Sequence, residues 1–282
     1  MKKNIILITG ASSGIGQEFA WQLDPYFDTI DEIWLIARNK EKLSQTAAYM
    51  RHKTRILSMD LTKEAQLERL SDTLADHNVC IRMLVNCAGY GLMGAFDSSW
   101  QSSEHSSQHS SGRSTEHSSD QSCGQDSPDG QLGMIRLNCE ALTHVTYCCL
   151  PYMSKGSRII QLSSSAAFLP QPGFAVYAAS KSYVLSFSRA LGEELRQREI
   201  YVTSVCPGPV DTPFFDIAEK YGSTLGFKKY TMVDVERVVA QAIRHSYYKK
   251  TMSVCSLPIK AFHVLTKCVP HQAILDVMRY LK

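Results

Sequence analysis

The sequence lacks the features that mark several specialised classes of protein. It contains no run of about eighteen apolar residues, so we expect no membrane-spanning helix. Its nine cysteines are scattered and form no C-x-x-C pair, a pattern that does not indicate a disulfide framework. The N-terminus has neither the long apolar core nor the small-residue cleavage site of a signal peptide. We therefore expect a reducing, cytoplasmic location.

A strong charge imbalance is also missing. The formal net charge of +3 is small, so the composition gives no reason to expect a nucleic-acid partner. What the chain does have is length and apolar content, since 282 residues with 44% hydrophobic side chains can bury one sizeable core. We predict a single α/β domain over residues 1–282.

The first motif joins an apolar run to a glycine-rich turn. Asn4–Thr9 suits a buried parallel strand, Gly10–Gly16 reads G-A-S-S-G-I-G, and a helical pattern follows to about Leu23. In this order the glycines let the backbone approach a pyrophosphate, and the helix N-terminus supplies N–H donors and a positive dipole. A glycine motif alone is as often a structural turn, but its place directly after the strand favours nucleotide binding.

The second strand pattern bears on the choice of cofactor. Glu32–Ala37 is followed directly by Arg38, and no acidic residue stands at this strand end. NAD sites place an acidic residue there, on the ribose 2′-hydroxyl. Arg38, helped by Ser12 or Ser13, fits a 2′-phosphate instead, which favours NADP(H) over NAD(H). The alternative is a solvated surface arginine.

Strand and helix patterns then alternate, and three later strand ends carry motifs. Asp60-Leu61 is placed to face an adenine, and N-C-A-G at Asn86–Gly89 combines an asparagine that can tie strands together with small residues that leave room for a cofactor. The rigid turn Cys206–Thr212 follows another strand, where open α/β sheets bind ligands. Asp211–Phe227 is an expected lid. We predict further strands at Thr54–Ser58, Met83–Asn86, Arg158–Leu162, Tyr201–Val205 and Met252–Cys255, and helices at Lys40–Arg51, Lys63–His77, Gln131–Met153, Ala175–Arg198 and Val233–His245.

Two segments differ from this alternation. From about Ser98 to Gly130 the chain is dominated by polar residues and cannot bury enough surface to offset its chain entropy, so we predict a flexible low-complexity insertion. Its histidines and cysteine fit no standard metal spacing, so we predict no metal site. The tail, Pro258–Lys282, is apolar and basic in turn. Ordinary packing is the favoured interpretation, and a substrate wall or a membrane-surface contact remains open. The side chains considered for metal are His105, His109, His117 and Cys123.

The chemistry centres on Tyr177 and Lys181, which are four residues apart and therefore on one face of a helix. An ammonium group beside a phenol favours the phenolate, so we expect the pKa of Tyr177 to fall below about 10. Such a hydroxyl can exchange protons as carbonyl reduction or alcohol oxidation requires. Ser164 follows a strand pattern, and the turn Pro170–Gly173 brings the chain back, so Ser164 can bond the same substrate oxygen. Alone, Y-x-x-x-K is equally typical of a plain amphipathic helix.

Together these motifs resemble the short-chain dehydrogenase/reductase family, in its short single-domain branch. The resemblance covers nearly the whole chain except about Ser98–Gly130, with Cys87 as a departure where the family more usually has a second Asn. It implies a Rossmann-type doubly wound parallel sheet of about seven strands with helices on both faces. It also implies homodimers or homotetramers that pair the helices at residues 131–153 and 175–198. The matched segments are Thr9–Gly16, Asp60-Leu61, Asn86–Gly89, Asn138, Ser164, Tyr177–Lys181 and Pro207–Thr212.

The resemblance implies roles for four catalytic residues. Tyr177 is the general acid in reduction and the general base in oxidation, and Ser164 orients and polarises the substrate oxygen. Lys181 lowers the pKa of Tyr177 and holds the nicotinamide ribose. Asn138, which from sequence alone is an unremarkable mid-helix residue or one that bends the helix, holds a water that links Lys181 to solvent. The expected cofactor contacts are Gly10, Ser12, Ser13, Gly14, Ile15, Gly16, Arg38, Asp60, Leu61, Asn86, Ala88, Gly89, Tyr177, Lys181, Pro207, Gly208, Val210 and Thr212, the last two at the carboxamide.

We therefore expect an NADP(H)-dependent oxidoreductase that interconverts a ketone and a secondary alcohol. The expected pocket walls, Gly91–Phe96, Phe168–Phe174 and Phe214–Phe227, are aromatic and apolar, which favours a lipophilic substrate such as a steroid or an acyl chain. A catalytically silent NADP(H)-binding sensor is the alternative, although it would not need Tyr177. The glycine spacing and the length speak against an extended epimerase or dehydratase of nucleotide sugars.

Overall fold

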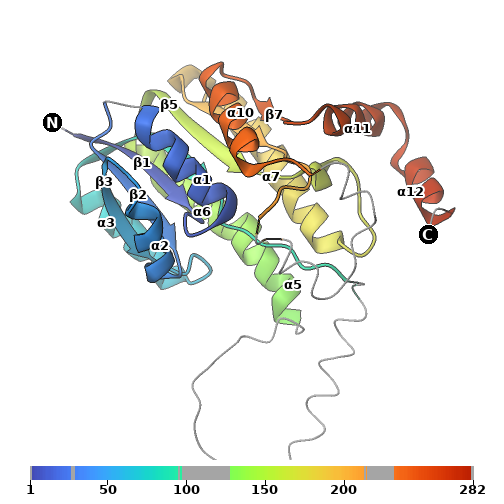
Figure 1. The fold of residues 1–282 in the computed structure, drawn as a ribbon, viewed down its shortest axis with the longest axis horizontal. Coiled ribbons are helices and arrows are strands. Elements are labelled where there is room, and N and C mark those ends of the chain that lie inside the picture. The colour runs from blue at the N-terminus through green and yellow to red at the C-terminus, as the bar shows by residue number, and fades with distance from the viewer. Residues whose placement is uncertain are drawn as a thin grey trace, which may run out of the picture.

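A single parallel sheet is the centre of the molecule (Figure 1). The structure is a computed structural model that describes residues 2–26, 29–94, 96, 128–212, 214 and 232–280. Its seven strands run in the order β3-β2-β1-β4-β5-β6-β7, and every neighbouring pair is parallel. This confirms the doubly wound sheet. The strands are β1 (Lys3–Thr9), β2 (Glu32–Ala37), β3 (Lys53–Ser58), β4 (Val79–Asn86), β5 (Met153–Leu162), β6 (Tyr201–Val205) and β7 (Met252–Ser253).

Helices cover both faces of the sheet, which explains why the central strands are apolar at nearly every position. In β1, Ile5 and Leu7 belong to the core on one face, whereas Ile6 and Ile8 belong to the core on the other. The first core is closed by α3 (Glu64–Asp76), α6 (Leu142–Cys149) and α7 (Ala175–Glu194). The second is closed by α1 (Gly14–Leu23), α2 (Lys40–Ala47) and α10 (Val235–Tyr247).

The strand order reverses between β1 and β4, and this reversal positions the site. The last residues of these strands, Thr9 and Asn86, pair in register. In open α/β sheets a ligand binds outside the carboxyl ends of the strands at such a switch point. The loops that follow Thr9 and Asn86 are the ones that carry the predicted cofactor motifs.

The predicted helix at Gln131–Met153 is the element that differs most from expectation. It consists of α5 (Pro128–Ile135), a π-helical turn η2 (Arg136–Ala141), α6 and a short 3₁₀ turn η3 (Leu150–Tyr152). Strand β5 then begins at Met153 rather than at Arg158, because Met153 pairs with Ile81 before a register shift in β4.

Smaller differences concern helix ends. The helix that carries Tyr177 ends at Glu194 and is followed by a 3₁₀ turn, η5 (Arg196–Arg198), before Glu199 takes a positive φ of 52°. Helix α2 ends at Ala47 instead of Arg51. A 3₁₀ turn, η1 (Asp24–Tyr26), follows α1.

The tail forms two helices, α11 (Leu257–Cys268) and α12 (His271–Tyr280). Helix α11 packs against the 3₁₀ turn η4 (Ser165–Phe168): the ring of Phe168 lies 6.4 Å from that of Phe262 and 4.3 Å from that of His263. Ordinary packing is thus the role of one side of α11, as expected. None of the helices that the structure describes is both long enough and apolar enough to cross a membrane.

Candidate active site

The glycine turn is held against the end of β4 by backbone contacts. The Thr9 hydroxyl oxygen accepts hydrogen bonds from the amides of Cys87 and Ala88, both at 3.2 Å. Gly10 has a φ of 69°, and a Cβ there would lie 2.7 Å from the Ala88 nitrogen. A Cβ on Gly16 would overlap the Gly10 carbonyl oxygen. The turn therefore requires glycine at both positions, and its compact shape fits the close approach of a pyrophosphate.

The other predicted residues of this turn lie at the start of α1. Ser13 is the exposed N-cap residue, and its side chain makes no capping hydrogen bond. Ser12 is half-buried, and Ile15 packs partly against the core. A Cβ on Gly14 would lie 3.4 Å from Cβ of Thr212, which joins the first motif in the chain to the last.

The Cys206–Thr212 turn is anchored on both sides. The Pro207 carbonyl accepts a hydrogen bond from the Ser165 amide at 2.8 Å, which fixes the turn beside Ser164. A Cβ on Gly208 would lie 2.8 Å from Cγ1 of Ile259 in α11. Val210 is buried and forms a β-bridge with Val233.

Arg38 and the Asp60-Leu61 pair flank the far side of the crevice. Arg38 is exposed at the end of β2, and in the described part of the chain no carboxylate pairs with its guanidinium group. Its carbonyl accepts a bond from the Ser58 hydroxyl at 2.8 Å. The Asp60 carboxylate instead accepts bonds from the amide and the hydroxyl of Thr62, and Leu61 is buried in the core. Contacts of these residues with a cofactor stay predictions.

Asn86 ties strands and a helix together, as the sequence suggested. Its amide nitrogen donates to the Thr146 hydroxyl and to the Gln161 side-chain oxygen, both at 3.0 Å. These bonds link β4 to α6 and to β5. The side-chain amide nitrogen of Asn86 is thus hydrogen-bonded inside the core and does not face the crevice. The small residues Ala88 and Gly89, which follow it, lie beside the crevice.

The predicted catalytic residues come together at the C-terminal ends of β4 and β5. The side chains of Tyr177 and Ser164 share a hydrogen bond. The Lys181 ammonium lies 5.6 Å from the centroid of the Tyr177 ring and donates to the Leu162 carbonyl at 2.9 Å. A Cβ on Gly89 would lie 2.8 Å from the Asn138 side-chain oxygen and 3.4 Å from the Lys181 nitrogen. Gly89 thus leaves open the space between these two polar groups.

The expected lowering of the Tyr177 pKa is wrong for the protein alone. Burial raises the pKa of Tyr177 to about 12, and the hydrogen bond to Ser164 lowers it by less. Burial also lowers the pKa of Lys181 to about 8, which the neighbouring thiols of Cys87, Cys139 and Cys206 only partly offset. The Lys181 ammonium lies over the Tyr177 ring and donates to a backbone carbonyl. The desolvation of Tyr177 therefore outweighs any effect of this ammonium on the pKa of the Tyr177 hydroxyl.

Asn138 sits inside the π-helical turn η2, a type of irregularity that is frequent at functional sites. Its side-chain oxygen accepts from the Tyr90 amide at 3.1 Å. Its amide nitrogen donates to the Tyr90 carbonyl at 2.9 Å and to the Ser180 hydroxyl at 3.1 Å. The buried side chain is therefore held in one orientation, between the β4 loop and α7.

Aromatic rings enclose the Tyr177 side chain. Phe174 stacks on it with ring centroids 4.2 Å apart, and the ring of Phe214 lies at 5.5 Å and 48°. A Cβ on Gly91 would come within 2.9 Å of all three rings. This surrounding is apolar, so it excludes water and favours a lipophilic ligand beside the hydroxyl.

Comparison with known proteins identifies the family of this chain. A family model described as short chain dehydrogenase matches residues 4–221. The chain belongs to the short-chain dehydrogenase/reductase family. An uncharacterised oxidoreductase of Staphylococcus epidermidis is 30% identical over 219 residues, which are 76% of this chain and 80% of that protein. The human very-long-chain 3-oxoacyl-CoA reductase is 29% identical over 211 residues, 71% of this chain and 57% of that protein.

Solved structures give the same family fold. A short-chain dehydrogenase from Sphingobium yanoikuyae in complex with NADPH superposes with a TM-score of 0.71 at 25% identity, covering 99% of this chain and 94% of that one. A short-chain dehydrogenase/reductase from Burkholderia phymatum in complex with NAD gives a TM-score of 0.72 at 19% identity, over 94% and 92%. This dehydrogenase/reductase is thus an oxidoreductase of alcohol or carbonyl groups that works with a nicotinamide cofactor.

Sequence reasoning missed the residues that hold the short-chain dehydrogenase site in place. Thr9, Tyr90 and Ser180 fix the glycine turn and Asn138 through bonds to residues more than 40 positions away, and no local pattern signals such pairs. Other expectations lie outside the described residues. They are the insertion up to residue 127 with its three histidines and Cys123, and the proposed lid and pocket wall at 213 and 215–231.

Proposed function

We propose that this short-chain dehydrogenase/reductase uses NADP(H) to interconvert a ketone and a secondary alcohol on a lipophilic substrate. The observation that carries the proposal is the Tyr177 hydroxyl, hydrogen-bonded to Ser164 and enclosed by aromatic rings, with buried Lys181 over its ring. A phenol held next to a second hydroxyl in an apolar setting suits proton transfer to a carbonyl oxygen.

The reductive step uses the two hydroxyls together. The nicotinamide cofactor, when bound at the glycine turn, supplies the hydride to the carbonyl carbon. Tyr177 is protonated near neutral pH because its pKa is about 12, and it donates its proton to the carbonyl oxygen. Ser164 donates a hydrogen bond to the same oxygen. Hydride on carbon and proton on oxygen give the secondary alcohol, and Tyr177 is left as a phenolate.

Lys181 and Asn138 then restore the proton. The pKa of Lys181 is about 8, so this group can release and recover a proton close to neutral pH. Asn138 adjoins Lys181 across Gly89 and leads toward the Tyr90 backbone. We assign Asn138 to the positioning of the relay between Lys181 and solvent. In oxidation the same groups act in reverse, with the phenolate of Tyr177 as the base.

Replacement of Tyr177 tests the mechanism. Tyr177→Phe should lower kcat by about 10²- to 10⁴-fold, the typical range for a lost general acid, while NADPH binding is kept. Tyr183→Phe is the matched control, since Tyr183 lies in the same helix but is exposed and should leave kcat unchanged. Stopped assays with NADPH and a panel of ketones measure turnover, and fluorescence titration measures binding. Full activity of Tyr177→Phe would refute the mechanism, and tight NADPH binding without any turnover by the natural chain would favour the silent sensor.

The preference for NADPH is part of the proposal and rests on Arg38. Its exposed guanidinium group, which pairs with no carboxylate among the described residues, stands where an acidic residue would bind the 2′-hydroxyl of NAD. Arg38→Asp should raise the Kd for NADPH at least about tenfold and shift preference toward NADH. Arg69→Asp on α3 carries the same charge change away from the crevice and should do neither. An unchanged preference in Arg38→Asp would show that Arg38 does not bind the phosphate.

A lipophilic substrate is supported by the wall around Tyr177 and by the name of one relative. Phe174 and Phe214 offer aromatic surface at the reacting hydroxyl. The human relative acts on 3-oxoacyl-CoA by its name. We expect kcat/KM to rise with apolar surface across a series of ketones of increasing chain length. A preference for small, charged carbonyl compounds would contradict this part of the proposal.

We also propose a homodimer through α6 and α7. Tyr147 and Tyr183 expose aromatic surface on these helices, and the Tyr183 hydroxyl bonds the Thr143 hydroxyl at 2.8 Å. Sedimentation of the purified chain should give a dimer mass or a multiple of it, and Tyr147→Lys with Tyr183→Lys should reduce it to the monomer. Tyr49→Lys, on another exposed tyrosine, is the control. A monomeric natural chain would refute this assignment.

A further inference from the structure

Helix α11 is apolar on two opposite sides, and among the residues that the structure describes only one side packs against the body of the protein. Ile259 and Thr266 are buried against the body of the protein. On the other side Leu257 is 78% exposed, Val264 59% and Leu265 48%. Their spacing of seven and eight residues places them on one face of a helix. Ala261 and Cys268 are exposed on that same face, so the outer side of α11 presents a continuous apolar stripe.

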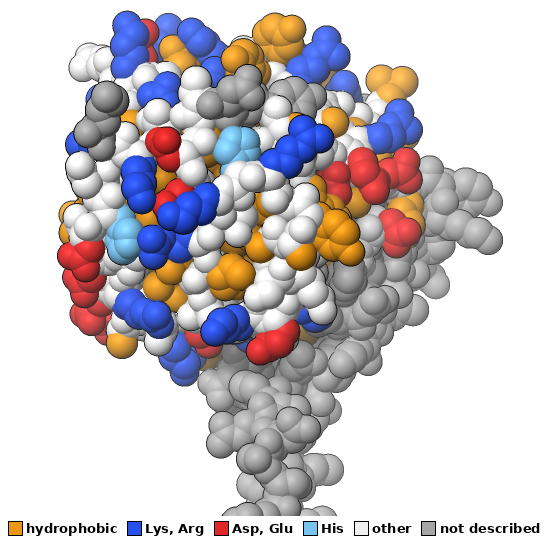
Figure 2. Space-filling view, turned by 60° about the vertical axis from the view of Figure 1, so that its left-hand side comes forward, with side chains coloured by type: hydrophobic (Ala, Val, Ile, Leu, Met, Phe, Trp, Pro, Cys, Tyr) orange, Lys and Arg blue, Asp and Glu red, His pale blue; other side chains and the backbone are white. Residues whose placement is uncertain are grey.

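The position of α11 makes this stripe accessible. Figure 1 shows α11 and α12 extending beyond the β7 edge of the sheet, away from the helices that cover its two faces. Helix α12 adds Val277, 59% exposed, and Tyr280, 89% exposed. In contrast, the face in Figure 2 carries small groups of hydrophobic side chains separated by charged ones.

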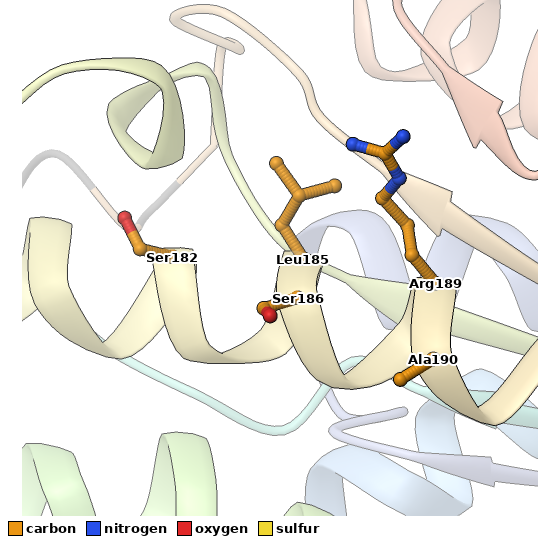
Figure 3. Close-up of a pocket in the computed structure, with 5 residues that line it drawn as sticks. All are labelled: Ser182, Leu185, Ser186, Arg189 and Ala190. Atoms are coloured by element: carbon orange, nitrogen blue, oxygen red, sulfur yellow. The ribbon is translucent and has the colours of Figure 1, made fainter.

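Basic side chains border the stripe. Lys260 and Lys267 lie on one edge of α11, and the helix contains no acidic residue. A shallow groove on α7 adjoins this edge, and Figure 3 shows Leu185 and Arg189 projecting from α7 on the same side. Leu185 packs against the buried cluster that contains Ile259 of α11. Burial is the main cause that lowers the pKa of His263, and the positive charges of Lys267 and Arg189 lower it further. The ammonium and guanidinium groups thus gather beside the apolar stripe.

The charge of the tail is also uneven. Residues 257–282 contain four Lys or Arg residues and one acidic residue, a net charge that equals the +3 of the whole chain. The single acid, Asp276, is engaged within α12 by Gln272 at 2.9 Å and by Arg279 at 3.5 Å. Within described residues 257–280, Asp276 is the one acidic side chain, so no second carboxylate side chain is present there to neutralise Lys260 and Lys267.

We propose that the outer face of α11, with α12, docks on the surface of an anionic lipid bilayer. An amphipathic helix binds such a surface when its apolar face enters the headgroup boundary and adjacent Lys and Arg residues meet anionic lipids. A helix of twelve residues is about 18 Å long, so it lies along the surface rather than across it.

The same observations argue against a second copy of the chain on this face. Two α11 helices packed about a twofold axis would bring Lys260 and Lys267 close to the same residues of the partner, with no acid on α11 to pair with them. Like charges at close range oppose such contact, whereas an anionic bilayer satisfies both the apolar stripe and its basic border.

Docking through α11 has a geometrical consequence for the crevice. Ile259 adjoins Gly208 of the Cys206–Thr212 turn, and Phe262 adjoins Phe168 of η4, directly after Ser164. A bilayer against the outer side of α11 would therefore lie one helix away from the two segments that flank Ser164. The docking itself requires no turnover, so it stands or falls independently of the proposed reaction.

Vesicle co-sedimentation of the purified full chain tests the charge contribution. We expect binding to phosphatidylcholine vesicles that contain about 30% phosphatidylserine, and much weaker binding to phosphatidylcholine alone. Neutralising both border lysines in Lys260→Gln with Lys267→Gln should reduce partition about 30-fold at low salt. The matched control, Lys63→Gln at the N-cap of α3 with Arg69→Gln within α3, removes the same charge far from α11 and should leave partition within about twofold.

A second pair of variants tests the apolar stripe. Leu257→Ser with Val264→Ser should reduce partition at least about tenfold, and Tyr49→Ser, which removes an equally exposed side chain elsewhere, should not. Circular dichroism and NADPH binding show that each variant is folded. Equal partition of the natural chain and the α11 variants, or binding unaffected by anionic lipid, would overturn the proposal. A fall in oligomer mass in Leu257→Ser with Val264→Ser, without a fall in partition, would assign the face to a second copy and likewise overturn it.

Discussion

The two halves of the crevice are built by different means. On the cofactor side, the turn Gly10–Gly16 lies against Cys87 and Ala88, and the contacts are made mainly by backbone atoms and the Thr9 hydroxyl. On the catalytic side, the orientation of the groups depends on buried polar side chains. Asn138, Ser180 and Lys181 are each at most 4% exposed, and they bond one another or nearby backbone.

This difference predicts how each half of the crevice responds to mutation. Added volume disturbs a site whose walls are backbone, because a main chain cannot move aside as a side chain can. Removal of a hydrogen-bonding group disturbs a site whose walls are buried polar side chains, because its partner is left unsatisfied. Four variants, in order of expected effect, separate the two responses.

The largest effect is expected at Lys181. Lys181→Met should lower kcat by about 10²-fold or more, because proton return to Tyr177 is lost. In the natural chain, the rate of reduction should fall as the pH rises through about 8, the folded-state pKa at which Lys181 loses its proton. A profile of kcat against pH measures this limb, with Lys63→Met as the control. Persistence of the same limb in Lys181→Met would show that another group titrates there.

The same pKa has a consequence for stability, and its sign is opposite to that of a salt-bridged lysine. The folded-state pKa of about 8 lies below the ordinary value of 10.5. The buried ammonium therefore disfavours folding below about pH 8, and this cost disappears as the pH rises from about 8 to 10.5. Denaturation of the chain without cofactor across this range should show a rising contribution from Lys181 that is absent in Lys181→Met.

Gly16→Ala tests the cofactor side. Its methyl group would overlap the Gly10 carbonyl, so the turn must shift, with a cost of about 1–3 kcal/mol in stability. We expect the Kd for NADPH to rise at least about tenfold, while residual activity at saturating NADPH shows a normal pH profile. Gly192→Ala is the matched control, because a Cβ there makes only ordinary contact with Val202 at 3.6 Å. Unchanged NADPH affinity in Gly16→Ala would mean that the turn does not bind the cofactor.

Asn138→Ala tests the catalytic side without touching substrate. It removes the hydrogen bonds that Asn138 makes with the Tyr90 amide and the Ser180 hydroxyl, which should lower the free energy of unfolding by about 2 kcal/mol. We expect kcat to fall about tenfold and KM to change little, because the variant alters proton return rather than substrate binding. Asn39→Ala removes a surface N-cap at about 1 kcal/mol and should leave kcat unchanged. Equal kcat in both variants would reduce Asn138 to a structural role.

The smallest effect is expected from Thr9→Val, which keeps the side-chain shape but removes the acceptor for two amides. We expect a loss of about 1–2 kcal/mol in stability and a severalfold weaker affinity for NADPH, with kcat preserved. Thr73→Val, on a half-buried helical threonine whose hydroxyl donates to the Arg69 carbonyl, is the control. A loss of kcat in Thr9→Val at saturating NADPH would show that the two halves are coupled.

The comparison also explains which parts of the fold the sequence could predict. Strands β2 and β6 have the predicted bounds. For β2 the sequence marks both ends, because its apolar run lies between the charged residues Asp31 and Arg38. The first residues of β5 were missed because M-S-K-G-S has no strand pattern. They join the sheet through tertiary contacts, among them the Arg82 guanidinium on the Ser154 hydroxyl at 3.1 Å.

The site follows the same division. Spacing alone indicated that Tyr177 and Lys181 share a helix face, and the strand–turn–helix order indicated the glycine turn. The direction of the Tyr177 pKa shift could not be predicted, because it depends on burial of the side chain, to which Phe214 contributes from far along the sequence. The clamp on Asn138 likewise depends on Tyr90, 48 positions away.

The π-helical turn η2 lies between α5 and α6 in one continuous helical segment. Its hydrogen bonds span one residue more than those of an α-helix, so α5 and α6 are rotated relative to each other compared with an uninterrupted helix. Met134 of α5 can therefore face Leu92 while Val145 of α6 faces the sheet, with Asn138 between them aimed at the β4 loop. One continuous helical segment therefore contributes to the wall of the substrate region at its α5 end and to the sheet-facing core at its α6 end.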